Sequence, residues 1–145
     1  MAITTNTTTF WALTTADKTI TLADFELWTN AVDWLTLTAD TLNTWLYSAS
    51  WAHTIAPAGA WDQAWEKYEI KSVLWTSDWV TWINQTDLNT FTAFDWVKTL
   101  YTTDMPERVD WTSDLTVSLN SAINTITPSA SDYTDTITFT VTGNF

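Results

Sequence analysis

Tryptophan and threonine dominate this chain and restrict the folds open to it. Of 145 residues, 12 are Trp and 32 are Thr, whereas 2 are Gly and none is Cys. Threonine is stiff at χ1 and Trp covers a large apolar area, so both residues favour the pleated, half-buried surface of a β-sheet. Twelve indole rings also exceed what the core of one small domain needs. We therefore expect a mainly β fold in which some rings are buried against another molecule.

Length and charge narrow the classes of protein further. A chain of 145 residues that is 46% apolar suits one ordered domain with its own core. It has no run of 18 apolar residues, so no membrane-spanning helix is expected. The net charge of −12 rests on 17 acidic and only 5 basic residues. Without clustered Lys and Arg to contact phosphates, nucleic acid is not an expected partner.

The first fifteen residues differ in composition from the rest of the chain and are predicted to form a separate segment. Residues 1–15 are almost uncharged and favour an extended arm, whereas residues 16–145 are expected to form a single β-rich domain. We predict that the arm adds as a strand to a neighbouring subunit, with a flexible tail as the alternative. Phe10 and Trp11 would be its anchors. The predicted donor residues are Ile3, Thr5, Thr7, Thr9, Phe10 and Trp11.

The middle of the chain is compatible with two structures. Leu22, Phe25 and Trp28 follow helical spacing, as do Leu88, Phe91 and Phe94. Against helices, the many β-branched and aromatic residues lose rotamer freedom in a helix. Residues 67–74 alternate at period two, as strands do. We therefore predict mainly strands with one or two short helices, and keep an α+β fold with Trp-rich helices in residues 21–101 as the alternative.

The last third carries the clearest pattern. A turn-forming segment at residues 127–132 precedes a stretch with an apolar and a hydroxylated face. Asp135 is the one exception on the apolar face. That face is predicted to hold Tyr133, Asp135, Ile137, Phe139 and Val141, and the other to hold Thr134, Thr136, Thr138, Thr140 and Thr142. This pattern favours an antiparallel sheet that is buried on one face, as in a single antiparallel β-sandwich.

Residues 127–142, with their run Tyr133-Thr134-Asp135-Thr136-Ile137, resemble a known class of strand. They are similar to the closing strand of immunoglobulin-like and jelly-roll domains in prokaryotic surface and fibre proteins. Spore-coat and pilus-like subunits, WxL domains and the TasA and camelysin matrix-fibre proteins end in such a strand. The resemblance covers about 30 residues and carries over no functional residue. It implies a single antiparallel β-sandwich, immunoglobulin-like or jelly-roll, that assembles outside the cell by one subunit lending a strand to the next.

Catalytic chemistry has little support in the sequence. The single histidine, His53, lacks the nucleophile elbow that would place it in a catalytic triad, and one His is too few for a His-based metal site. Close carboxylate pairs occur, but any acidic chain offers them. With only two glycines, no phosphate-binding loop is present. We expect no enzyme, no cofactor and no metal.

Aromatic side chains are densest between residues 61 and 82. Such rings serve either as core and subunit interface, where Trp is enriched, or as a platform that stacks on sugars. We favour the interface. The residues concerned are Trp61, Trp65, Trp75, Trp79 and Trp82. Asn6 and Asn84 match the N-glycosylation pattern, which matters only for an exported protein.

The function expected from these features is structural. We predict a subunit that self-assembles into an extracellular filament or a virion appendage or coat through strand exchange, so that its main partner is itself. The hydroxyl-rich, lightly charged composition favours an extracellular, cell-surface or virion location. The alternative is a carbohydrate-binding module that uses exposed tryptophans, with glycans or a cell surface as partner.

Overall fold

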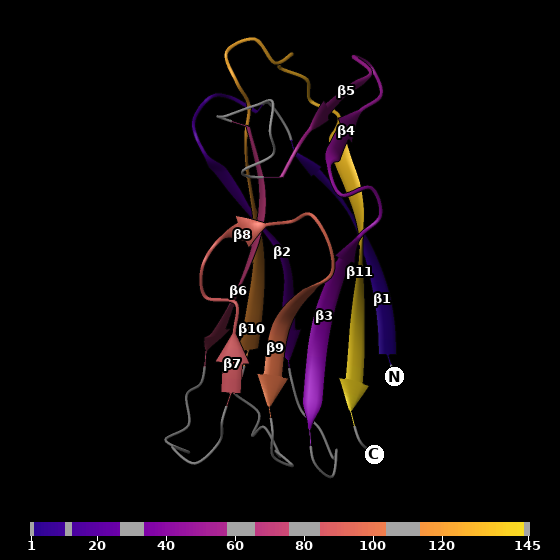
Figure 1. The fold of residues 1–145 in the computed structure, drawn as a ribbon, viewed down its shortest axis with the longest axis vertical. Coiled ribbons are helices and arrows are strands. Elements are labelled where there is room, and N and C mark those ends of the chain that lie inside the picture. The colour runs from indigo at the N-terminus through magenta and orange to yellow at the C-terminus, as the bar shows by residue number, and fades with distance from the viewer. Residues whose placement is uncertain are drawn as a thin grey trace.

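A computed structural model describes residues 2–10, 13–26, 34–57, 66–75, 85–103 and 114–143 of the chain. These residues form eleven strands arranged as two antiparallel sheets, and none of them lies in a helix. Figure 1 shows the strands running along the long axis of the molecule in two layers. The predicted β-sandwich of mainly β structure is therefore confirmed.

The first sheet has β11 near its centre. Its strand order is β5-β4-β11-β3-β9-β7, and β1 pairs with the other side of β11. The strands are β1 (Ala2–Phe10), β3 (Leu35–Thr41), β4 (Leu46–Ser48), β5 (His53–Ile55), β7 (Gln85–Asp87), β9 (Lys98–Thr103) and β11 (Tyr133–Gly143). β3 and β4 pair with the same side of β11 in succession, so β11 has partners on both of its edges.

The second sheet is smaller and has the order β2-β10-β6-β8. Its strands are β2 (Lys18–Glu26), β6 (Lys67–Trp75), β8 (Thr92–Ala93) and β10 (Asp114–Ala122). β10 pairs along its length with both β2 and β6, and its register with β2 shifts between Val117 and Ser118. A shift of this kind bends a strand and increases its twist, which fits the sheet to the curved face of its partner.

Alternation of side chains explains why β11 is a strand. Tyr133, Asp135, Ile137 and Phe139 are buried, and the threonines between them are partly exposed. This is the two-faced pattern that the sequence predicts for the last strand. The sheet therefore presents apolar side chains to the second sheet and hydroxyl groups to solvent.

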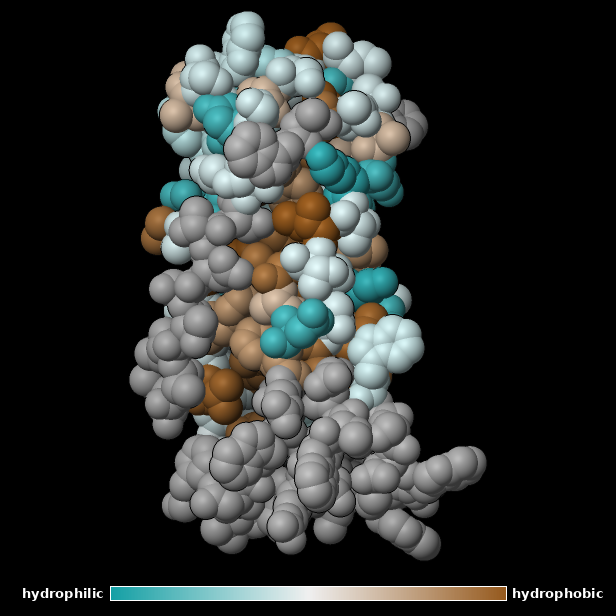
Figure 2. Space-filling view, turned by 180° about the vertical axis from the view of Figure 1, so that it is seen from behind, coloured by the Kyte–Doolittle hydropathy of each residue, from teal (hydrophilic) through white to brown (hydrophobic). Residues whose placement is uncertain are grey.

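The core lies between the two sheets and is built from aliphatic, Phe and Tyr side chains. β3 contributes Leu37, β6 contributes Ile70 and β10 contributes Leu119, all of them fully buried. The rings of Phe25 and Phe139 meet edge to face across the sheets, with centroids 4.9 Å apart. Figure 2 shows the molecule from behind, with hydrophobic side chains gathered in the middle of that face.

The helical alternative for residues 21–101 is not found in any described residue of that range. Leu22 and Phe25 lie in β2, and Phe91 and Phe94 flank the two-residue strand β8. The spacing of these residues matches a helix, but the β-branched and aromatic residues around them favour strands. Pairing of β2 with β10 and of β8 with β6 then decides the local structure.

Among the residues that the structure describes, no helix is long and apolar enough to cross a membrane.

The core makes a direct prediction about stability. Leu119→Ala removes a fully buried side chain, and we expect it to lower the free energy of unfolding by about 2–5 kcal/mol. Leu42→Ala is the matched control: Leu42 is 72% exposed, and its loss should change stability by about 0.5 kcal/mol or less. Urea unfolding followed by circular dichroism measures both. Equal losses in the two variants would contradict the assignment of this core.

Candidate functional site

The predicted donor segment forms an edge strand of its own chain's first sheet. All nine residues of β1 pair with β11 in antiparallel register, from Ala2 opposite Val141 to Phe10 opposite Tyr133. The predicted donor residues Ile3, Thr5, Thr7 and Thr9 lie opposite Thr140, Thr138, Thr136 and Thr134 in that order. In a single chain the segment is thus a strand on its own body, and pairing with another copy stays a prediction.

Phe10, one of the two predicted anchors, is fully buried and belongs to the core. The other, Trp11, lies outside the described residues. Burial of a Phe side chain contributes about 1.5–3 kcal/mol, so one end of β1 is held by packing as well as by main-chain hydrogen bonds. β1 pairs with β11 on one side, and no described strand pairs with the other side of β1. β1 is therefore an addition at the edge of the sheet.

The chain is fixed to the body immediately after β1. Leu13 is fully buried, and its carbonyl accepts a hydrogen bond from Ser129 Oγ at 3.1 Å. The next carbonyl, that of Thr14, accepts one from the Ile123 main-chain N–H at 3.0 Å. These contacts hold the start of the connection to β2 against the segment between β10 and β11. Residues 11–12 therefore separate two parts of the chain that are held independently.

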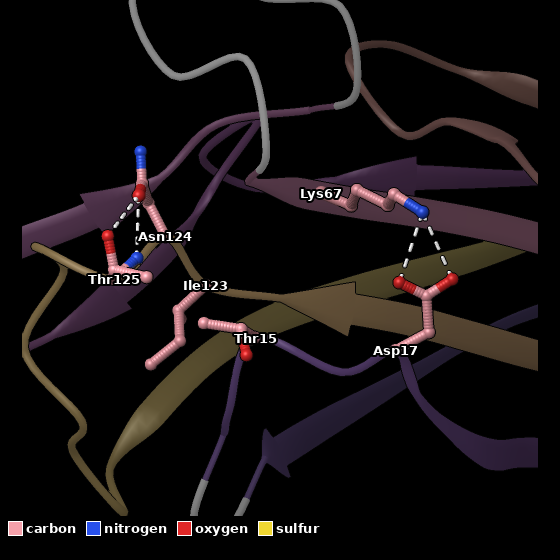
Figure 3. A pocket seen from close by; sticks show the side chains of 6 residues that line it. All are labelled: Thr15, Asp17, Lys67, Ile123, Asn124 and Thr125. Atoms are coloured by element: carbon pink, nitrogen blue, oxygen red, sulfur yellow. Dashed lines mark hydrogen bonds and ion pairs between the residues drawn. The ribbon is translucent and has the colours of Figure 1, made fainter.

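A third contact holds the same connection, at one wall of a pocket of about 360 Å³. Lys67 Nζ donates to both carboxylate oxygens of Asp17, each at 3.0 Å, and this hydrogen bond raises the pKa of Lys67. Figure 3 shows this pair on one side of the pocket, and Asn124 and Thr125 on the other. The lining residues are Thr15, Asp17, Lys67, Ile123, Asn124 and Thr125.

Asp135, the exception in the alternating pattern, is a buried link between the two sheets. Its Oδ2 accepts hydrogen bonds from Thr41 Oγ1 in β3 and, at 2.8 Å, from Tyr68 Oη in β6. Its Oδ1 accepts the main-chain N–H of Thr136 at 2.7 Å. Burial, and then the charge of Asp135 and its hydrogen bond, raise the pKa of Tyr68 well above its usual value. Tyr68 therefore remains a neutral donor to the carboxylate.

A second buried carboxylate lies near the start of β11. Glu66 accepts a hydrogen bond from Thr127 Oγ1, and His53 Nε2 lies 3.5 Å from the same oxygen, Oε1. Its other oxygen has no hydrogen-bond partner among the described residues. The Tyr133 ring packs edge-on against that of His53 at 6.4 Å, and its hydroxyl donates to the Pro128 carbonyl at 2.9 Å. His53 is singled out in the sequence as the one histidine, but no local pattern predicts its contact with Glu66 or Tyr133.

Tyr133 connects the residues around Glu66 to the pairing of β1 with β11, because Tyr133 also lies opposite Phe10. Burial, followed by the negative charges of Glu66 and Asp132, raises the pKa of Tyr133 to about 12. Its bond to a carbonyl five residues upstream resembles the tyrosine corner of β-sandwich domains. The Phe10 end of β1 is thus packed beside fixed polar groups.

Exposure of the indole rings is the second notable feature of the surface. The tryptophans that the structure describes are all at least 44% exposed: Trp34, Trp45, Trp51, Trp75 and Trp96. Trp75 is the one described member of the predicted aromatic platform and is 63% exposed, whereas Trp61, Trp65, Trp79 and Trp82 lie outside the described residues. These five rings take no part in the core and are available for contacts with another molecule.

Four of the exposed rings lie towards the two ends of the sandwich, and Trp96 lies between β8 and β9. Trp34 precedes Leu35, which pairs with Gly143 at the last residue of β11, and Trp75 pairs with Asp114 at the start of β10. Trp45 and Trp51 instead flank β4, near the first residues of β11. The turn that carries Trp51 is fixed by Asp132. Its carboxylate accepts from Ser48 Oγ at 2.6 Å and from the Ser50 main-chain N–H at 2.9 Å.

The two predicted glycosylation positions are placed differently. Asn6 is in the middle of β1, opposite Ile137, and Asn84 lies outside the described residues. Modification of either residue stays a prediction.

A scan of the chain against protein-family models, and searches of curated proteins and of solved structures, returned no match. The resemblance of the last strand to surface and fibre proteins therefore stays a prediction, and function has to be inferred from the geometry described above.

The buried tyrosines predict a loss of stability in alkali. A phenol whose pKa is raised on folding contributes stability below its unfolded pKa of about 10, and that contribution is lost as the pH rises towards the folded value. For Tyr133 this window runs from about pH 10 to about 12. Between about pH 8 and pH 11 the wild type should lose about 1 kcal/mol more than Tyr133→Phe does. Urea unfolding at both pH values measures the difference, and parallel losses would contradict it.

Proposed function

We propose that this protein is a structural subunit that assembles with copies of itself by exchanging β1. The assembly would be an extracellular filament, or an appendage or coat of a virion. One observation carries the proposal: β1 is an edge strand that pairs with β11 along its whole length, and a short connection joins it to a firmly held body. Removal of such a strand uncovers one edge of β11 and leaves the other strand pairs of the sheet in place.

The energetics of exchange support this assignment. A copy of β1 from a neighbouring chain has the same sequence and can make the same nine-residue ladder, so the bonds lost within one chain are regained between two. Main-chain hydrogen bonds supply affinity, and burial of Phe10 fixes the register, because a slip by one residue would move it off the core face. The balance between the two states is then set by concentration and by the connection between strand and body.

The edge of the sheet also lacks the usual protection against pairing. Natural edge strands are often protected against pairing by charged residues, especially Lys, or by Pro. β1 has none of these, and the one charged residue of β11, Asp135, is buried in the core. Because the chain as a whole carries a charge of −12, repulsion between copies opposes indiscriminate association and is weakened by salt.

Exchange is tested by mixing two single-cysteine variants of this cysteine-free chain. Thr5→Cys and Thr138→Cys chains are unfolded together, refolded and oxidised. Directly opposed residues in an antiparallel pair have Cα atoms about 4.5–5.5 Å apart, within the range that a disulfide spans. We expect a covalent species that contains one chain of each kind, because the two thiols meet across the ladder when β1 is exchanged. Mass spectrometry identifies it.

The control replaces Thr138→Cys by Thr54→Cys, an exposed position on β5 that does not face Thr5 in the ladder. Mixed species should be at least about tenfold rarer with this partner, a difference of about 1.4 kcal/mol. If both mixtures give the same low yield, while both variants fold, exchange of β1 does not occur and the proposal fails.

The exposed tryptophans favour one second candidate, a carbohydrate-binding module. An indole ring offers an apolar face to the C–H bonds of a sugar, and Trp75 combines high exposure with a position at the end of a rigid strand. This candidate concerns the outer surface and is independent of strand exchange.

Titration of soluble polysaccharides, followed by Trp fluorescence, tests the second candidate. Trp75→Ala should weaken binding at least about tenfold, or about 1.4 kcal/mol. Trp96→Ala removes a ring from the segment between β8 and β9 that is 71% exposed, against 63% for Trp75; it is the control and should bind as the wild type does. A wild type that responds to no glycan, or equal effects of the two substitutions, would rule this candidate out.

A further inference from the structure

Two features of the exchange site lie at the same end of the sandwich. Phe10 joins the ladder opposite Tyr133, the first residue of β11. The body holds the chain again at Leu13, through Ser129, which precedes Tyr133 by only four residues. Figure 1 shows that β1 ends and β2 begins towards the end of the molecule opposite to both termini. The end of a copy from which its own β1 would leave is therefore also the end at which the Phe10 end of a neighbour's β1 would be received.

The connection between these points is short. From Phe10 to Leu13 the chain advances by three residues, which span at most about 11 Å when fully extended. In an exchanged assembly Phe10 lies beside Tyr133 of the receiving copy, while Leu13 stays bound to Ser129 of the copy that donates it. The anchor of one copy and the start of β11 in the other must then lie within about 11 Å of each other.

This limit determines how two copies can be arranged. They must meet through like ends, because donation and reception both use the end that carries Tyr133. When one copy has donated β1, its own vacated β11 edge lies at the contact. The arm of the receiving copy emerges at the same place, so the second exchange is intramolecular within the pair and has a high effective concentration.

We propose that the exchange of β1 is reciprocal and joins two copies into a closed pair with two-fold symmetry. This inference rests on the proposed function and names the partner at the site. Each copy gives its β1 to the other copy, and the vacated edge of its own β11 receives the β1 of that same partner. The contact is isologous, since the same surface is used on both sides. Both ladders are restored in such a pair, so no unpaired edge of β11 remains to recruit a third copy. Strand exchange then builds the pair, and growth of pairs into a filament or coat uses another surface of the molecule.

A double variant distinguishes the arrangements. Thr5→Cys and Thr138→Cys are placed in one chain, which is refolded, oxidised and separated by size in denaturant without reductant. We expect a species of two chains and no longer series, because denaturant removes every contact except disulfides. A ladder of three, four and more chains would overturn the closed pair but retain strand exchange. Single chains with an internal disulfide would overturn exchange itself, and with it the proposed function.

Two further variants show whether the result depends on the ladder and on the short connection. In the Thr38→Cys, Thr140→Cys chain the thiols face each other between β3 and β11 of one body, so this control should give single chains only. Insertion of twelve Gly and Ser residues between Trp11 and Ala12 in the Thr5→Cys, Thr138→Cys chain relaxes the limit on reach. The two-chain species should then give way to single chains with an internal disulfide or to longer series, because a longer connection lets β1 reach its own β11 or that of a third copy. An unchanged pattern in this folded variant would contradict the role assigned to the connection.

Discussion

The hydrogen bonds on both edges of β11 are the interaction on which the rest of this structure depends. One edge pairs with β3 and β4, and the other pairs with β1 along nine residues. The buried face of the same strand supplies Ile137 and Phe139 to the core, and Asp135 connects it to Tyr68 in the second sheet. A single strand thus joins β1 to the rest of the first sheet and connects the two layers of the sandwich.

The buried carboxylates help to specify the register of β11, although their burial costs them their hydration. Burial of Asp135 and Glu66 removes both from water. Asp135 is compensated by the hydroxyls of Thr41 and Tyr68, whereas Glu66 accepts from the Thr127 hydroxyl through one oxygen only, and its other oxygen has no partner among the described residues. A buried acceptor that loses its donors is destabilising by about 1–3 kcal/mol or more. Alternative registers of β11 would separate Asp135 from Thr41 and Tyr68, and this penalty disfavours them.

Local pattern predicted the fold better than it predicted the contacts of the site. The alternation from Tyr133 to Phe139 depends on neighbouring residues, so the sequence suffices to predict the last strand. The partner of Asp135 is 67 residues away in the chain, and that of Leu13 is 116 away, so no local signal could identify either. The extended character of residues 2–10 is likewise predictable from the sequence, but their partner strand, β11, lies at the other end of the chain, so no local signal identifies it.

The exposed Trp34 and Trp75 mark the end of the sandwich opposite to Tyr133. In a reciprocally exchanged pair, both of these tryptophan-bearing ends face outwards. If pairs add to one another through them, every junction along the fibre relates two identical surfaces. Such a fibre has no direction: its tips are equivalent, and it elongates at the same rate from either one.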